Sequence, residues 1–132
     1  MNYLVDTHCL IWSLIEPSRL SPKHRELLLE PASTKLVSKV SYWEISLKYS
    51  LGKLELNGVT PEELLKTAVD SGYETYDIAE DDLATSYQLV RSETHKDPFD
   101  RLLIWQCLRN NLTFMTVDRR ILEYSKYGLK IE

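Results

Sequence analysis

Residues 97–118, DPFDRLLIWQCLRNNLTFMTVD, combine the clearest helix signal in the chain with the clearest strand signal. Asp97 and Pro98 predict a helix start, because aspartate is a preferred N-cap residue and proline suits the first helical position. The mainly apolar run over 98–111 then predicts a long, buried helix. The stretch TFMTV, residues 113–117, consists of apolar and β-branched residues and predicts a strand. A buried helix followed so closely by a buried strand indicates an α/β fold.

Strand and helix signals alternate along the rest of the chain. Most strand candidates are short and apolar, which is typical of a parallel sheet covered by helices on both faces. We therefore expect a three-layer α/β/α fold with a mostly parallel central sheet of four to five strands, in a single domain over residues 1–132. Strands are expected at 2–5, 35–40, 73–78, 113–117 and 129–131, and helices at 7–15, 21–30, 41–50, 61–72, 80–90, 98–111 and 119–128.

The composition is that of an ordinary globular protein, and it restricts the function classes. A net charge of −4 argues against a protein that coats nucleic acid with a uniformly basic surface. Cys9 and Cys107 lie in apolar helical patterns, so we expect small buried core residues rather than a disulfide or a zinc pair. The apolar N-terminus contains Asp6 and His8 and no basic segment, so it predicts neither a signal peptide nor a membrane span. A cytoplasmic protein is expected.

Four acidic residues are expected near the ends of strands. Asp6 and Asp118 directly follow strands, while Glu44 and Asp100 fall in the first turns of helices. Ligands of parallel sheets bind beyond the carboxyl ends of the strands. Four carboxylates gathered at that edge would repel one another unless cations lay among them. Carboxylate oxygens without a nearby His or Cys suit hard cations such as Mg²⁺ or Mn²⁺. The hypothesis is a site for one ion, or a pair of ions, that supports phosphodiester hydrolysis.

Each of these acids also has a purely structural interpretation. Ser41 and Glu44 are spaced as a capping box, and a negative charge at Asp100 would suit the helix dipole. Asp118 could cap the last helix, and Asp97 alone is best interpreted as an N-cap. Taken singly, Glu44 and Asp100 are equally compatible with capping and with metal binding. Capping would be served as well by Ser, Thr or Asn, so the four acids together favour the metal site.

The motifs around the acids resemble those of PIN-domain nucleases, specifically the VapC group of ribonuclease toxins in type II toxin–antitoxin modules. Four segments carry the resemblance in the family's order and span nearly the whole chain: LVDTHCLIW, VSYWEISLKYSLGKL, HKDPFDRLLIWQC and TVDRRILEY. They are similar to the family's opening LLDT, to S…WEI..K…GKL, to H.DPFDR.LIAQA and to the terminal T.D..…Y. Trp105 and Cys107 depart from the pattern, because the family usually has alanine there. That departure alters packing on the long helix and leaves the acids intact.

The resemblance implies that catalytic, metal-binding acids are present at Asp6, Glu44, Asp100 and Asp118. It also implies Mg²⁺ as the cofactor, with Mn²⁺ as an alternative, and RNA as the substrate. The expected partners are a second copy of the chain in a homodimer and a cognate antitoxin that covers the acidic groove. Residues expected to support the acids are Thr7, Asp97, Arg101, Thr116 and Arg119.

The supporting residues have alternative interpretations. Thr7 and Thr116 flank acids and could orient carboxylates or water, or they could serve only as capping and strand residues. Arg101 and Arg119 could hold an RNA phosphate, or they could pair with the neighbouring acids. His95 is interpreted as an exposed loop residue in preference to a substrate contact. Three aromatic residues are interpreted as packing residues: Trp12, Trp43 and Tyr124.

Two other functions compete with the nuclease. A catalytically silent PIN-fold interaction module would have the same fold, but it would be expected to have lost one or more acids. A phosphatase or phosphotransfer domain fits less well. A haloacid-type phosphatase needs an aspartate where this chain has His8, and a receiver domain needs an early acid pair that the sequence lacks. Binding of Mn²⁺ that depends on Asp6 or Asp100 would separate the enzyme from the silent module.

Overall fold

The computed structural model describes residues 1–132 as a sequence of strands and helices that alternate along the chain. In chain order the elements are β1 (Asn2–Val5), α1 (Thr7–Ile15), η1 (Pro17–Arg19), α2 (Pro22–Leu29), β2 (Thr34–Ser38), α3 (Lys39–Ser50), α4 (Pro61–Asp70), β3 (Glu74–Tyr76), α5 (Glu80–Thr85), η2 (Ser86–Gln88), α6 (Pro98–Asn110), β4 (Thr113–Met115), η3 (Arg119–Tyr127) and β5 (Lys130–Ile131), where η denotes a 3-10 helix.

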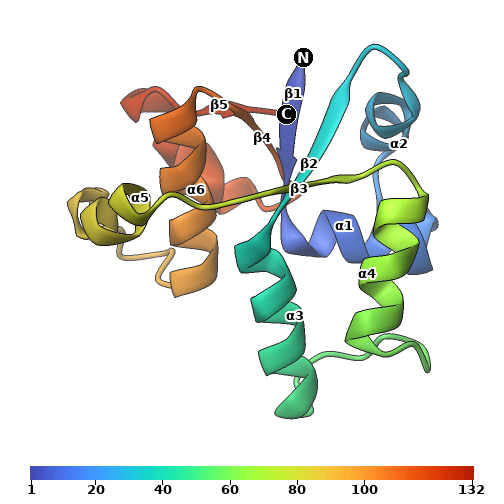
Figure 1. Cartoon of the computed structure of the whole chain (residues 1–132). Helices are drawn as coiled ribbons and strands as arrows, with labels where there is room; N and C mark the ends of the chain where they lie inside the picture. Colours follow the sequence, from blue (N-terminus) through green and yellow to red (C-terminus); the bar gives the residue numbers. More distant parts are fainter.

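The five strands form one sheet in the order β3-β2-β1-β4-β5, and every pair is parallel (Figure 1). The predicted α/β fold is therefore confirmed, with a sheet that is parallel throughout. In the central strand, Leu4 is paired with Leu36 of β2 on one side and with Phe114 of β4 on the other. The chain builds β1, β2 and β3 in one direction and then crosses to β4 and β5. The direction of winding reverses between β1 and β4, which is where α/β sheets form a ligand-binding crevice.

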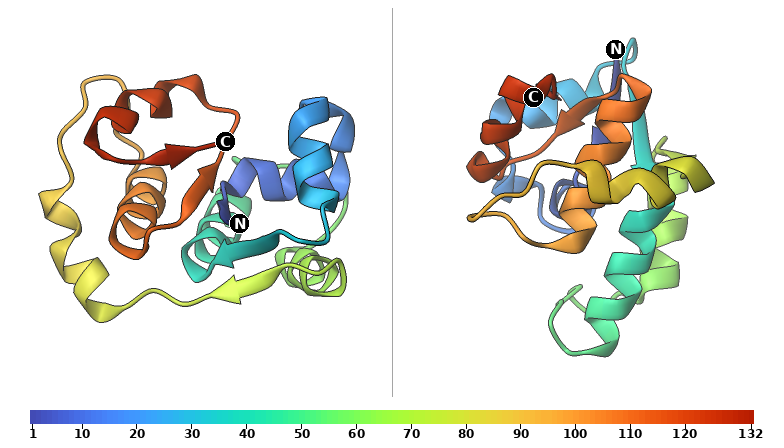
Figure 2. Two further views of the ribbon diagram at one scale, coloured as in Figure 1. Left: turned by 90° about the horizontal axis from the view of Figure 1, so that it is seen from above. Right: turned by 90° about the vertical axis from the view of Figure 1, so that its left-hand side faces the viewer.

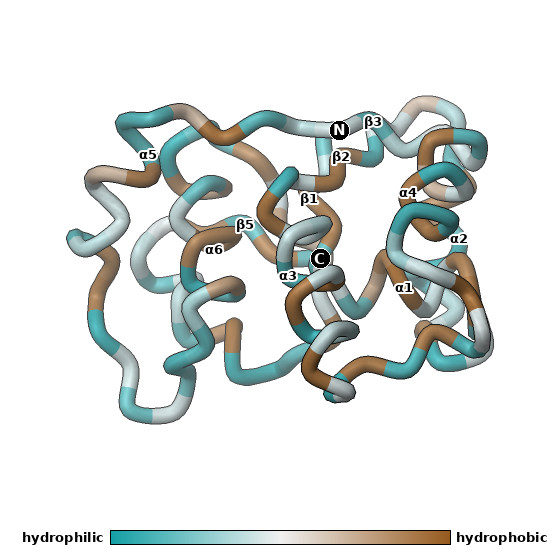
Figure 3. Tube along the Cα trace, turned by 60° about the horizontal axis from the view of Figure 1, so that its bottom comes forward, coloured by the Kyte–Doolittle hydropathy of each residue, from teal (hydrophilic) through white to brown (hydrophobic).

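Both faces of the sheet are buried. Successive strand residues point to opposite faces, so neighbouring residues belong to different cores. Tyr3 and Val5 belong to one core, together with residues of α1 and α4, while Leu4 belongs to a second core with residues of α6 and η3. Figures 1 and 2 show these two helix groups on opposite sides of the strands. Figure 3 shows hydrophobic stretches in β1, α1 and α6, the elements that meet in these cores. This packing explains why the strands read as continuous apolar runs.

Cys9 and Cys107 are buried free thiols, as predicted. They lie in the two different cores, on opposite faces of the sheet. Burial raises the pKa of both thiols well above the ordinary cysteine value, so neither is a reactive thiolate. None of the helices combines the length and apolar character that a membrane crossing requires.

The helix α3 begins earlier than predicted. Ser38 is its N-cap, because the Ser38 hydroxyl accepts a hydrogen bond from the backbone N–H of Val40 at 3.1 Å. The prediction that the helix begins at Ser41 is therefore wrong, as is the capping-box interpretation of Ser41 and Glu44. The strand before the helix extends to Ser38, which is paired with Tyr76 of β3. Glu44 consequently lies in the second turn of α3.

Other boundaries also differ from the predictions. Strand β4 ends at Met115, so the last residues expected in it, Thr116 and Val117, lie outside the strand. The helix expected over 80–90 is divided into the short helices α5 and η2. The segment expected as a helix over 119–128 is the 3-10 helix η3, which Gly128 ends in a left-handed conformation with φ 98°.

A capping box begins α4. The Thr60 hydroxyl accepts from the N–H of Glu63 at 3.3 Å, and Glu63 accepts from the N–H of Thr60 at 3.4 Å. Thr60→Ala is expected to lower the free energy of unfolding by about 1 kcal/mol, because the N–H of Glu63 loses its acceptor. Urea denaturation measures the change. The matched control is Thr67→Ala, whose exposed hydroxyl bonds back to the Glu63 carbonyl. It is expected to be neutral or slightly stabilising, and equal losses in both variants would contradict the capping argument.

Candidate metal centre

Two of the predicted acids follow the central strands, and one threonine connects them. The Thr116 hydroxyl donates to Asp6 Oδ2 at 2.7 Å and accepts from the N–H of Asp118 at 3.1 Å. The N–H of Asp6 donates to the carbonyl of Met115 at 2.8 Å, which fixes the end of β1 against the end of β4. Asp6 and Asp118 are thus held on either side of the point where the sheet reverses its winding. Thr116 orients both of them.

Glu44 reaches the same edge from the second turn of α3. Its carboxylate is buried, and it accepts from the Thr7 hydroxyl at 2.6 Å and from Lys48 Nζ at 2.5 Å. The Thr7 oxygen also lies 2.9 Å from the Ser41 hydroxyl. Thr7 therefore links the first turn of α1 to α3, and Ser41 contributes to this link instead of to a capping box. Lys48 also lies 3.4 Å from Asp97 Oδ2.

The start of α6 has the geometry that the sequence predicts. Asp97 is the N-cap, and its Oδ1 accepts from the N–H groups of Phe99 at 2.9 Å and of Asp100 at 3.1 Å. Asp100 is then the third helical residue, and its carboxylate lies 3.2 Å from His95 Nε2. Capping by Asp97 starts the helix and so places Asp100 at the edge of the sheet. Within this motif, the capping interpretation therefore applies to Asp97 and the metal-binding interpretation to Asp100.

His95 is the main site residue that the sequence placed wrongly. It is 1% exposed, so the expectation of an exposed loop histidine is incorrect. Its Nδ1 lies 3.7 Å from Asp118 Oδ2, while Nε2 faces Asp100. The expectation of an acidic edge without a nearby histidine is therefore wrong as well. The histidine two residues before the helix cap, in HKDPFDR, was the available sequence signal.

Three of the four predicted acids belong to two overlapping groups at one edge of the sheet. One group is formed by His95, Asp100 and Asp118, and the other by Glu44, Asp97 and Asp100; within each group one ligand atom per residue lies within 4.8 Å of the others. Asp6 belongs to neither group. It is nevertheless a neighbour, because its charge contributes to the raised pKa of Asp100.

The electrostatics of this edge show the cost of gathering the acids. Burial, reinforced by the charges of Asp6, Asp97 and Glu44, raises the pKa of Asp100 to about 7. Burial also raises the pKa of Asp6 to about 6, although the hydrogen bond from Thr116 opposes this shift. Ionisation of these two carboxylates is therefore unfavourable in the protein without a bound cation. A cation among them would offset the repulsion.

The donor set fits a divalent cation. Asp6 Oδ1 is buried and has no hydrogen-bond partner, so one carboxylate oxygen at this edge is left for a ligand. Asp100 and Asp118 supply further carboxylate oxygens, which are the donors that hard cations prefer. A buried acceptor without a partner is costly unless a ligand satisfies it.

The arginines near the acids differ from the expectation. Arg101 does not pair with Asp100; its guanidinium donates to the carbonyls of Leu89 and Val90 and to the Tyr124 hydroxyl. Arg119 is exposed and does not pair with Asp118. Arg120 does so instead, with Nε 3.1 Å from Oδ1 and Nη2 2.9 Å from Oδ2. The hydrogen bond from Arg120 lowers the pKa of Asp118.

A hollow of about 680 Å³ adjoins the acidic edge. It is lined by Tyr87, Arg91, Lys96 and Arg101, and by His95, which lies against the acids. Its lining contains three basic residues and one acidic residue, Glu93. Basic side chains are therefore concentrated here, although the net charge of the chain is −4.

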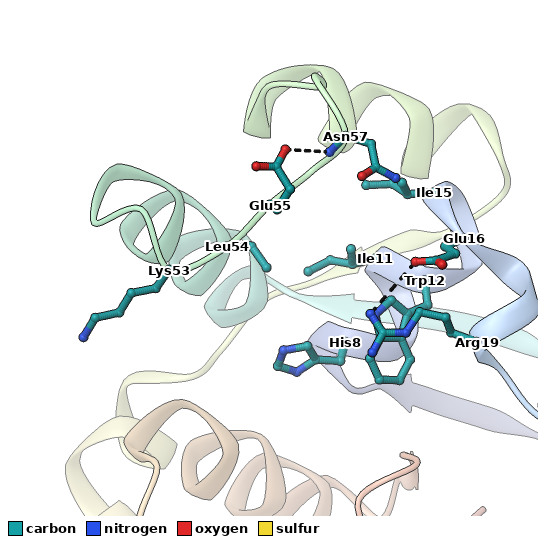
Figure 4. Close-up of a pocket in the computed structure, with 10 residues that line it drawn as sticks. All are labelled: His8, Ile11, Trp12, Ile15, Glu16, Arg19, Lys53, Leu54, Glu55 and Asn57. Carbon is teal, nitrogen blue, oxygen red and sulfur yellow. Dashed lines mark hydrogen bonds and ion pairs between the residues drawn. The ribbon is translucent and has the colours of Figure 1, made fainter.

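The second hollow, of about 430 Å³, lies beside α1 (Figure 4). Its lining includes His8 and Trp12, and the Arg19 guanidinium lies 4.3 Å from the centre of the Trp12 ring. None of the four acids lines it. Of the aromatic residues interpreted as packing residues, Trp12 is partly buried against the core and Tyr124 is fully buried. The interpretation of Trp43 is wrong, since it is 61% exposed and meets only the edge of Phe99.

A parallel sheet with buried acids at its reversal point defines an α/β protein with a candidate metal-dependent catalytic edge. A PIN domain family profile matches residues 3–127. The chain therefore belongs to the PIN domain family, the nuclease family that its motifs resemble. A search of curated proteins finds no match.

Solved structures share the whole fold at low sequence identity. A chain in the crystal structure of VapBC2 from Rickettsia felis, bound to a DNA fragment from their promoter, is 18% identical with a TM-score of 0.67, covering 100% of this chain and 98% of that one. A chain in the structure of VapBC-1 from nontypeable Haemophilus influenzae is 16% identical with a TM-score of 0.67, covering 100% and 97%. A domain of a functionally unknown protein from Methanocaldococcus jannaschii is 17% identical with a TM-score of 0.58, covering 99% and 89%.

Proposed function

We propose that this protein is a metal-dependent endoribonuclease, the VapC-type toxin of a type II toxin–antitoxin module. The observation that carries the proposal is the acidic edge, to which Asp6, Glu44, Asp100 and Asp118 contribute beside the reversal point of the sheet and in which one buried carboxylate oxygen has no partner. Membership of the PIN domain family supports the nuclease class. The intact set of acids argues against a silent interaction module.

The acidic edge holds the ion, Mg²⁺ or Mn²⁺. When bound, such an ion activates water and offsets charge that develops on phosphate oxygens. Thr116 and Thr7 hold the carboxylates of Asp6 and Glu44 in fixed orientations. Asp100 is aligned by the helix start at Asp97. These contacts hold the acids in place before substrate arrives, so little reorganisation is needed during the reaction.

The basic hollow supplies a surface for the RNA backbone. Arg91 and Lys96 line it beside His95, and the Tyr87 ring is 81% exposed in the same lining. Cationic side chains bind phosphates without regard to sequence, and an exposed aromatic ring stacks on unpaired bases. This arrangement suits a single-stranded or looped stretch of RNA that enters from the hollow and places one phosphodiester at the acids.

The partners that we propose are a cognate antitoxin and a second copy of the chain. The VapBC2 and VapBC-1 structures support the antitoxin, because their chains share this fold over their whole length. An antitoxin that covered the edge with a basic side chain would neutralise the same carboxylates that the ion neutralises.

The direct test is cleavage of a structured RNA mixture by the purified, antitoxin-free protein, with Mg²⁺, with Mn²⁺ and with chelator. Cutting with either ion and none with chelator would support the enzyme. The rival is the silent module, and calorimetry with Mn²⁺ separates the two. Binding of Mn²⁺ without cleavage of any RNA in the mixture would favour another substrate, while absence of both would overturn the nuclease.

Thr116→Val is expected to weaken binding of Mn²⁺ by about 10- to 100-fold, since residues that orient metal ligands have effects of this size. The change removes the hydroxyl that holds Asp6 and Asp118 but keeps the shape of the side chain. Calorimetric titration measures it. Thr113→Val, at a buried strand position that none of the acids contacts through a side chain, is the control. Equal affinity in wild type and Thr116→Val would show that this hydroxyl does not organise the site.

A further inference from the structure

His95 is a buried side chain that the acidic site does not yet explain. Its ring lies between two carboxylates, with Nε2 3.2 Å from Asp100 Oδ2 and Nδ1 3.7 Å from Asp118 Oδ2. The residue is 1% exposed, and neither ring nitrogen has a hydrogen-bond partner. A buried imidazole normally satisfies at least one nitrogen. This one has two unpartnered nitrogens directed at acids, so the position calls for a ligand.

The separation of His95 from Asp100 matches that of two neighbouring metal ligands. Ligands at adjacent corners of an octahedron with bonds of about 2.1 Å are about 3 Å apart. The observed 3.2 Å is close to this value, and neither ring nitrogen has a hydrogen-bond partner. With Asp118, these atoms form a group with ligand atoms within 4.8 Å of one another.

The ring is held in this orientation before any ion binds. The backbone N–H of His95 donates to the Ser92 hydroxyl at 3.1 Å, and this bond fixes the backbone of the loop. The ring meets Tyr124 edge-on, with centroids 6.5 Å apart and an interplanar angle of 83°. Tyr124 is itself fully buried and receives a hydrogen bond from Arg101. A ligand fixed in this way binds an ion at a lower cost in conformational entropy.

Cationic side chains already pair with three of the acids in these two groups. Lys48 Nζ lies 2.5 Å from Glu44 Oε2 and 3.4 Å from Asp97 Oδ2. Arg120 Nη2 lies 2.9 Å from Asp118 Oδ2. No lysine or arginine pairs with Asp100, whose paired side chain is His95. Asp100 and His95 are therefore the part of the edge left for a metal ion.

We propose that His95 is a direct nitrogen ligand of a single divalent ion, bound together with Asp100 and Asp118, and that this ligand selects a transition metal over Mg²⁺. The inference rests on the proposed metal-dependent function and specifies its cofactor. Imidazole nitrogen suits transition metals, whereas Mg²⁺ prefers oxygen donors alone. A mixed set of one nitrogen and carboxylate oxygens thus favours divalent transition-metal ions, Mn²⁺ among them, over Mg²⁺.

The test is electron spin echo envelope modulation of the full chain loaded with one equivalent of Mn²⁺. Nitrogen coupling is expected in the wild type, and labelling of histidine with ¹⁵N is expected to change its frequency. The coupling disappears in His95→Asn and persists in His8→Asn, the control at the other histidine near the acids. Absence of coupling in the Mn²⁺-loaded wild type, or its persistence in His95→Asn, would overturn the inference. The wild-type measurement tests the proposal even if a variant folds poorly.

Affinities provide a second readout. His95→Asn is expected to lower the affinity for Mn²⁺ by at least about 10-fold and that for Mg²⁺ by less than about threefold. Equal losses for both ions would assign His95 a positioning role and overturn the ligand. The two proposals can fail separately. Mn²⁺-dependent RNA cleavage without nitrogen coupling would overturn only the assignment of His95 as a ligand. Nitrogen coupling without cleavage would overturn only the proposed nuclease function. Failure of Mn²⁺ to bind at all overturns both.

Discussion

Asp100→Asn is expected to lower the rate of RNA cleavage by at least about 1,000-fold, which corresponds to about 4 kcal/mol of transition-state stabilisation. Asp100 is the one acid common to both groups of candidate ligands, so its loss weakens the whole edge. Asn keeps the size and the helical position of the side chain but removes the negative charge. Single-turnover cleavage with excess protein measures the effect on the chemical step.

The same variant is expected to stabilise the metal-free protein at high pH. Because the pKa of Asp100 is raised to about 7 in the folded protein, folding disfavours the ionised form. The resulting loss of stability begins as pH rises above the ordinary aspartate pKa and is complete above pH 7. In chelator at pH 8, the melting temperature of Asp100→Asn is therefore expected to exceed that of wild type by roughly 5 °C. At pH 4 the two are expected to be similar.

Asp81→Asn is the matched control for both effects. Asp81 is an exposed acid on α5, so this variant changes the net charge equally without touching the edge. Its cleavage rate and melting temperature are expected to equal those of wild type. A slow Asp100→Asn that also melts lower than wild type in chelator would contradict the argument, since misfolding would then explain the lost activity.

The second large effect is on folding. Leu103→Ala is expected to lower the free energy of unfolding by about 3 kcal/mol, because it removes a completely buried side chain and leaves a cavity. Leu103 lies on the side of α6 that packs in the core with Leu4 and Phe114. Urea denaturation with an unchanged slope against denaturant concentration measures the loss. Total stabilities of about 5–15 kcal/mol leave this variant folded at 25 °C.

The neighbouring Leu102 provides the control, since it is only partly buried on the same helix. Leu102→Ala is expected to cost about 1 kcal/mol or less, because less apolar surface is lost and alanine is a slightly better helix former. Similar losses in the two variants would mean that α6 is not packed as the structure places it.

The architecture follows from local patterns, and the acids follow from the architecture. Continuous apolar strands alternating with helices predict a parallel sheet, and carboxyl ends of parallel strands meet at one edge. Asp6 and Asp118 could therefore be placed from the sequence alone. Glu44 was placed at the right edge but in the wrong turn, because Ser38 and Ser41 are equally good caps. In the structure Ser38 is the cap and also the last paired residue of β2, opposite Tyr76 of β3, and that is a contact between distant segments.

His95 could not be placed by any local pattern. Its burial depends on the start of α6 and on η3, and its two acidic neighbours are Asp100 and Asp118. A loop histidine with no periodic neighbours is normally exposed, and only the packing of these elements makes it otherwise. The Arg119 expectation failed for a related reason. Asp118 caps the 3-10 helix η3, which places Arg120 instead of Arg119 against the carboxylate.

The bond between Thr116 and Asp6 joins residues that are 110 positions apart. The ribosome makes β1 first, but its neighbour β4 is made after all the other strands except β5. Until residues 113–118 have emerged, Asp6 has neither its second neighbouring strand nor its hydrogen-bond donor, and Asp118 does not yet exist. A growing chain therefore has no assembled acidic edge. Any activity of that edge can therefore begin only after the last strands of the chain have been made.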